Sequence, residues 1–95
     1  MDTEDMFFLE VIFVGRVQGV GFRWTTKNLA DGFAVTGYVK NLPNGTVEMV
    51  VEGEESEARK FLAALQARMS GYLEDSEVVT ENFGPRRFTE FSIAY

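Results

Sequence analysis

The feature that most constrains this chain is an apolar strand that breaks into a glycine-rich loop and then enters a helix. The segment VIFVGRVQGVGFR runs from Val11 to Arg23. Its glycines leave backbone N–H groups free of Cβ crowding, so that these groups can converge on a small anion. The positive end of the following helix points to the same place, and Arg23 adds a guanidinium that can bind two phosphate oxygens. The pattern predicts a phosphate-binding loop.

The glycines alone also allow a simpler interpretation, an ordinary turn with an incidental arginine. No Gly-Lys-Ser/Thr follows them, as it would in a nucleotide-binding P-loop. A dinucleotide-binding loop would have a third glycine where this chain has Trp24. The loop therefore does not by itself indicate a nucleotide.

Hydrophobic periodicity predicts five strands and two helices over the rest of the chain. Strands are expected at Met6–Val14, Val35–Leu42, Thr46–Glu52, Glu77–Phe83 and Phe91–Tyr95, and helices at Phe22–Phe33 and around Ala58–Met69. Residues 72–76 are expected to form a linker, and Gly84-Pro85 a turn. In the third strand, Glu48 and Glu52 are expected to point outward. No internal repeat or second domain is indicated, so residues 6–95 are expected to form one domain after a flexible tail at residues 1–5.

This order of elements is that of the split βαβ, ferredoxin-like α+β fold, an antiparallel sheet of four or five strands with two helices on one face. A right-handed crossover makes the first two long strands parallel and leaves room for the third between them. Their C-terminal ends then lie at the same end of the sheet. The first strand leads into the glycine loop and the second ends at Asn41, before a predicted Leu42–Gly45 turn. Topology therefore brings Asn41 towards the loop.

Composition limits the chemistry that this chain can perform. It has no histidine and no cysteine, which removes Ser-His-Asp catalysis, thiolate chemistry and most transition-metal sites. No metal or cofactor is expected, because the acidic residues do not form a compact ligand pattern. No apolar run approaches the ~20 residues that span a membrane. With an acidic N-terminus in place of a leader peptide, a cytoplasmic location is the expectation.

Charge is unevenly distributed along the chain. The net charge of −6 argues against a nucleic-acid partner. Residues 11–46 nevertheless carry four basic side chains against one acidic side chain, whereas the remainder carries five against fourteen. A small positive region in an acidic chain suits a small anionic substrate.

Two segments of this sequence resemble the acylphosphatase family. They are GRVQGVGFR at Gly15–Arg23 and GYVKNLPNGTVEMVVEG at Gly37–Gly53, in the family's order and separation, and the closing FTEFSIAY is similar to the family's last strand. The resemblance covers most of residues 7–66. It implies metal-independent hydrolysis of an acyl phosphate to a carboxylate and inorganic phosphate, which would act as product and inhibitor.

The resemblance also implies roles for individual residues. Arg23 would bind the phosphate and Asn41 would orient the attacking water. The phosphate would be held by backbone amides of the loop, which comprises Gly15, Arg16, Val17, Gln18, Gly19, Val20 and Gly21. The chemistry agrees, because the leaving carboxylate needs no general acid, and phosphoryl transfer depends mainly on positioning and electrostatics. A monomer acting on a small molecule is expected.

Two other functions are weighed beside this interpretation, and the sequence departs from the family pattern at Ala34 and in the segment Gly71 to Glu77, which lacks the Gly-Pro common in the family. A non-catalytic module that binds a phosphate-bearing ligand would need the loop and Arg23 but not Asn41. An RNA-binding domain would need a basic, aromatic sheet face, whereas Glu10, Glu48 and Glu52 are expected near Phe8. Ala34 stands where the family usually has a glycine, which predicts strain of ~1 kcal/mol in a left-handed helix cap.

Overall fold

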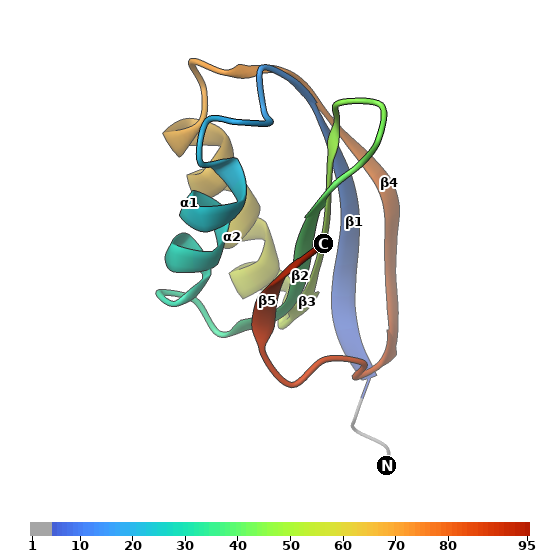
Figure 1. Ribbon diagram of the computed structural model, residues 1–95. Coiled ribbons are helices and arrows are strands. Elements are labelled where there is room, and N and C mark those ends of the chain that lie inside the picture. Colours follow the sequence, from blue (N-terminus) through green and yellow to red (C-terminus); the bar gives the residue numbers. More distant parts are fainter. Residues whose placement is uncertain (1–4) are drawn as a thin grey trace.

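The computed structural model describes residues 5–95, which form a five-stranded sheet with two helices packed on one face (Figure 1). The elements are β1 (Asp5–Gly15), α1 (Phe22–Ala30), β2 (Val35–Asn41), β3 (Val47–Gly53), α2 (Glu55–Arg68), β4 (Leu73–Pro85) and β5 (Phe91–Ala94). The strand order is β4-β1-β3-β2-β5. This is the ferredoxin-like α+β fold that the sequence predicts. Asp5, expected in the tail, begins β1, and residues 1–4 of the expected tail lie outside the described residues.

The core lies between the sheet and the helices, and the inward-facing side chains of the central strands build it. Every second residue of β1 from Phe7 to Phe13 is buried, and β3 contributes Val47, Met49 and Val51 in the same way. Helix α2 covers these side chains with Ala58, Phe61, Leu62 and Leu65. These faces account for the hydrophobic periodicity from which the three elements are predicted.

Strand pairing determines where the loops lie. β1 and β2 each pair antiparallel with β3, so they run parallel to each other with β3 between them. The loop after β1 and the β2–β3 turn therefore emerge at the same end of the sheet, the upper end in Figure 1. The Gly45 N–H donates to the Leu42 carbonyl at 3.1 Å, and Gly45 has a φ of 91°. These features confirm the predicted turn.

Helix α1 is shorter than the sequence predicts. It ends at Ala30 instead of Phe33, because the amides of Asp31, Gly32 and Phe33 each bond the carbonyl three residues back, which tightens the final turn. Phe33 still packs against the core, and this contact accounts for its place in the hydrophobic pattern. The strain expected at Ala34 is absent, since no non-glycine residue among residues 5–95 has a positive φ.

The C-terminal part of the chain also differs from expectation. β4 extends from Leu73 to Pro85, so most of the predicted linker and the predicted Gly84-Pro85 turn are strand. β4 pairs with β1 from Gly15↔Leu73 to Asp5↔Pro85. The backbone pairing therefore extends beyond Glu77–Phe83, the stretch in which the hydrophobic pattern predicted a strand. β5 pairs with β2 in parallel, and the sheet is therefore mixed where an antiparallel sheet was expected.

Glu52 lies on the outer face of β3, as its position in the strand predicts, but it is 1% exposed. Its carboxylate accepts hydrogen bonds from the Thr36 hydroxyl at 2.9 Å and from the backbone N–H groups of Arg87 and Phe88 at 3.2 and 2.9 Å. The segment between β4 and β5 therefore covers it. A buried carboxylate that satisfies several donors holds this segment against the sheet.

Candidate active site

A cavity of about 290 Å³ opens where α1, the loop after β1 and the end of β2 meet. Its lining combines two polar side chains with loop backbone and an apolar rim. The lining residues are Val17, Gly19, Gly21, Phe22, Arg23, Trp24, Asn41, Ile93 and Tyr95. Arg23, in the first turn of α1, and Asn41, the last residue of β2, thus face one space.

The loop between β1 and α1 presents backbone to this cavity. Gly19 and Gly21 both have φ values of 78°, and a Cβ atom on either would meet nothing within 4 Å. Gly21 also precedes the first turn of α1, where no side chain caps the helix and no acidic residue is present. The first helical bond runs from the Thr25 N–H to the Gly21 carbonyl. The preceding N–H groups are therefore available to an anion, and the helix dipole favours one there.

The other loop residues anchor this segment, and of these only Val17 also lines the cavity. The Arg16 N–H donates to the Tyr72 carbonyl at 2.9 Å, and its exposed guanidinium lies 6.0 Å from the centroid of the Tyr72 ring. Gly15 is required by close approach, because a Cβ atom there would overlap the same carbonyl. Val20 is partly buried against the core. Val17 has both roles: it lines the cavity, and it anchors the loop because its side chain is 1% exposed and belongs to the core.

The Gln18 side chain turns away from the cavity to the β2–β3 turn. Its Nε2 group donates to the carbonyl oxygens of Leu42 and Thr46, each at 2.8 Å. Only the backbone of Gln18 thus remains for the anion-binding role that the sequence suggested.

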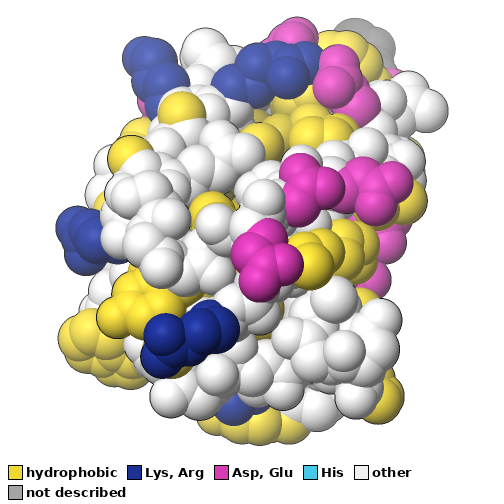
Figure 2. Space-filling view, turned by 90° about the horizontal axis from the view of Figure 1, so that it is seen from above, with side chains coloured by type: hydrophobic (Ala, Val, Ile, Leu, Met, Phe, Trp, Pro, Cys, Tyr) yellow, Lys and Arg dark blue, Asp and Glu magenta, His cyan; other side chains and the backbone are white. Residues whose placement is uncertain are grey.

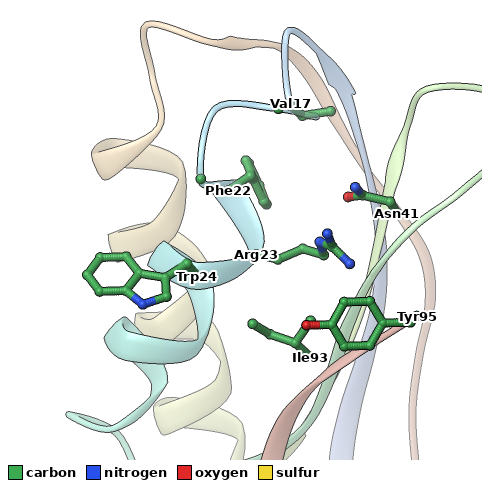
Figure 3. A pocket seen from close by; sticks show the side chains of 9 residues that line it. Val17, Phe22, Arg23, Trp24, Asn41, Ile93 and Tyr95 are labelled. Carbon is green, nitrogen blue, oxygen red and sulfur yellow. The ribbon is translucent and has the colours of Figure 1, made fainter.

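Arg23 projects from the first turn of α1 towards the strands, between Asn41 and Tyr95 (Figure 3). Its Nη1 lies 3.5 Å from the Ala94 carbonyl oxygen, a long and weak hydrogen bond. Within residues 5–95, no carboxylate forms a salt bridge with it. The positive charge of Arg23 is therefore available to an anion in the cavity.

Asn41 is the last residue of β2 and is half-buried. It lies opposite Val47 in the sheet register and on the same side of β2 as buried Val39. In the described part of the chain, its side-chain amide forms no hydrogen bond. The amide can thus both donate to and accept from a molecule in the cavity.

Sequence reasoning missed the contribution of β5. Ile93 and Tyr95 line the cavity because β5 lies beside β2. The one signal in the sequence was the family-like closing segment, which assigned no role to either residue. Trp24 was also missed, although its indole points to the opposite side of α1 from Arg23 (Figure 3).

Charge distinguishes this cavity from a second one of about 460 Å³ at the other end of the sheet. Three acidic side chains line the second cavity, those of Asp5, Glu54 and Glu55, so it does not suit an anion. At the end where the glycine loop lies, Lys and Arg side chains stand in separate patches, and acidic side chains lie mainly in the centre and right-hand part of the view (Figure 2).

Across residues 5–95, no three acidic side chains are placed to hold a metal ion. Neither of the two helices is long and apolar enough to cross a membrane.

Comparison with known proteins assigns the family. The acylphosphatase family model matches residues 9–93, a range that includes the whole glycine loop, Arg23 and Asn41. The chain belongs to the acylphosphatase family. An acylphosphatase of Lactobacillus gasseri is 41% identical over 83 residues, covering 85% of this chain and 90% of that protein. An acylphosphatase of Treponema denticola is 38% identical over 93 residues and covers 98% of both chains.

Solved acylphosphatase structures share this fold. The crystal structure of the acylphosphatase from Bacillus subtilis superposes with a TM-score of 0.71 at 34% identity, covering 95% of this chain and all of that one. The acylphosphatase fold thus accounts for nearly the whole described chain.

Proposed function

We propose that this protein hydrolyses acyl phosphates to a carboxylate and inorganic phosphate by in-line attack of water. The observation that carries the proposal is that Arg23, Asn41 and the glycine-loop backbone line one small cavity. Membership of the acylphosphatase family supports the same reaction.

The loop and Arg23 bind the phosphoryl group. The N–H groups from Gly19 to the first turn of α1 point their positive ends at its oxygens, and the Arg23 guanidinium binds it in two places. These donors are fixed before the substrate arrives, so they stabilise the charge on the equatorial oxygens with little reorganisation. A flexible side chain alone would have to be ordered on binding, and would therefore hold the phosphoryl group less well than these fixed donors do.

Asn41 orients the nucleophile. Its carbonyl oxygen accepts a hydrogen bond from water, which attacks phosphorus on the side opposite the acyl oxygen. As the bond between water oxygen and phosphorus forms, the bond from phosphorus to the acyl oxygen breaks, and the carboxylate leaves with that electron pair. The proton released by water passes to the phosphate product or to solvent. The neutral amide does not repel the dianion, as an aspartate would.

The proposed reaction needs one chain and no cofactor. Every group assigned to it lies between Gly15 and Asn41, so a monomer acting on a small molecule suffices. The net charge of −6 disfavours a nucleic-acid substrate. We also propose a cytoplasmic location and a metal-independent mechanism.

The direct test is phosphate release from an aryl acyl phosphate such as benzoyl phosphate, with and without excess EDTA. We expect hydrolysis that chelation does not reduce. A loss of activity restored only by Mg²⁺ or Mn²⁺ would refute the metal-independent mechanism. Phosphate binding without any hydrolysis would instead identify a non-catalytic binding module.

A further inference from the structure

We propose that Gln18 is a positioning residue: its side chain fixes the position of Asn41 relative to the phosphate-binding loop. This inference rests on the proposed hydrolysis and assigns a function to a side chain that points away from the cavity. Gln18 and Asn41 belong to different connections, one between β1 and α1 and the other at the end of β2. The geometry joins the two through a single amide group.

The Gln18 Nε2 group uses both of its hydrogens on the β2–β3 turn. It lies 2.8 Å from the Leu42 carbonyl oxygen and 2.8 Å from the Thr46 carbonyl oxygen. The same two carbonyls close the turn, because they also accept the N–H groups of Gly45 at 3.1 Å and Leu42 at 2.9 Å. Gln18 therefore holds the base of the turn, and one of its acceptors belongs to the residue directly after Asn41.

The loop needs such an attachment because its tip is otherwise loosely packed. Gly19 and Gly21 have open space where a side chain would lie, and both are exposed. Val17 and Val20 pack the base of the loop against the core. Gln18 joins the loop to the end of β2 through its hydrogen bonds to the β2–β3 turn.

Asn41 needs it for a different reason. Its amide has no hydrogen-bond partner among residues 5–95, so the direction of the side chain depends on the backbone that carries it. A shift of ~1 Å in a positioned group can cost about 10²-fold in rate. Movement of the turn relative to the loop would thus misplace the water while leaving the loop amides and Arg23 able to bind phosphate.

The experiment measures kcat with benzoyl phosphate and the inhibition constant of inorganic phosphate for Gln18→Met, which keeps the length of the side chain but removes its donors. We expect kcat to fall by about 10- to 100-fold, with a smaller loss of phosphate affinity. Gln66→Met, the same change at a half-buried position on α2, should leave both quantities unchanged. A Gln18→Met enzyme with wild-type kcat would overturn the inference.

Two further variants separate positioning from general stability. In an Asn41→Ala background, Gln18→Met should lower kcat much less than in the wild type, because the group through which it acts is already gone. Equal fold losses in the two backgrounds would contradict the proposal. Gln18→Lys keeps donors that can reach both carbonyls and should retain more kcat than Gln18→Met; a Lys variant as impaired as the Met variant would count against it.

The same measurements distinguish the two proposals. A wild-type protein that does not hydrolyse benzoyl phosphate refutes the proposed function and this inference with it. An active wild type whose kcat is insensitive to Gln18→Met refutes only the role of Gln18. Melting temperatures of all variants, measured beside kcat, show that the losses belong to folded protein.

Discussion

The guanidinium carbon of Arg23 lies 4.9 Å from the centroid of the Tyr95 ring. Arg23 lies in α1 and Tyr95 directly after β5, far apart in the sequence, and the parallel pairing of β5 with β2 brings them together. An aromatic ring holds a guanidinium without neutralising its charge, whereas a carboxylate would compete with the substrate. Arg23 is thus placed in the cavity with its charge available for an anion.

Replacement of Arg23 should remove most activity. Arg23→Ala loses a bidentate contact to a dianion, so we expect kcat/KM to fall by at least about 10³-fold and phosphate inhibition to weaken. Arg23→Lys keeps the charge but not the planar fork, and should also be strongly impaired. Arg68→Ala, on exposed α2 surface, is the control. Near wild-type turnover by Arg23→Lys would show that the fork has no catalytic role.

Replacement of Asn41 should affect the chemical step selectively. Asn41→Ala should lower kcat by about 10²- to 10³-fold with little change in phosphate affinity or melting temperature, because no hydrogen bond within residues 5–95 depends on this side chain. Asn41→Asp should weaken phosphate binding as well, through repulsion. Asn82→Ala on β4 is a matched control outside the cavity. Loss of phosphate binding by Asn41→Ala as severe as in Arg23→Ala would place Asn41 on the phosphate instead of the water.

The loop should respond differently to changes in its backbone and in its packing. Gly19→Val meets no neighbouring atom but forces a β-branched residue to a φ of 78°, at a cost of about 1–2 kcal/mol, so the loop should shift and phosphate affinity should fall. Val17→Ala removes buried methyl groups, so its main effect should be a lower unfolding free energy. Phosphate titration and urea unfolding of both variants measure the two effects. The reverse ranking would mean that loop side chains bind the ligand.

Glu52 should matter for stability more than any exposed carboxylate. Glu52→Ala leaves the Thr36 hydroxyl and two backbone N–H groups without their acceptor, and we expect a loss of about 3 kcal/mol in the free energy of unfolding. Urea unfolding measures it. Glu54→Ala, at an exposed position, is the matched control and should have little effect. Similar stabilities for the two variants would show that water replaces the buried carboxylate.

Tyr38 makes the stability of the folded protein depend on pH in the alkaline range. Burial, together with the hydrogen bond that its hydroxyl donates to Glu48 at 3.0 Å, raises the pKa of Tyr38 from 10.0 to about 12. A raised pKa in the folded state means that the stabilisation is complete below pH 10 and is lost as the pH rises towards 12. Unfolding free energies should therefore decline more steeply across this window in the wild type than in Tyr38→Phe. Identical slopes would contradict the shift.

Local sequence patterns predicted the features of the fold that depend on strict physical rules. Hydrophobic periodicity predicted the first strand, and the right-handed crossover rule brought Asn41 to the same end of the sheet as the loop. The Leu42–Gly45 turn followed from its proline and glycine. The strand and turn signals are local in the sequence, and the crossover rule holds for any chain of L-amino acids. A single sequence is therefore enough to apply them.

The features that the sequence did not predict depend on long-range contacts. β4 is an edge strand in which no residue is fully buried, so it lacks the alternation that would have shown its length. Glu52 is buried by a segment more than thirty residues away, and Tyr95 reaches Arg23 through parallel pairing. The Gln18 side chain likewise contacts carbonyls 24 and 28 residues away. No periodicity marks contacts of this kind.

The extent of β4 also affects how the protein behaves in a concentrated solution. Within residues 5–95, no strand pairs with the outer side of β4, so this side presents a row of unpaired backbone groups to which strands of other molecules can add. Exposed Val78, Val79 and Phe83 would favour such stacking, whereas Glu74, Asp75 and Glu77 bring negative charges of neighbouring copies close together. The acidity of this strand, which plays no part in the proposed chemistry, thereby protects the long exposed edge against aggregation.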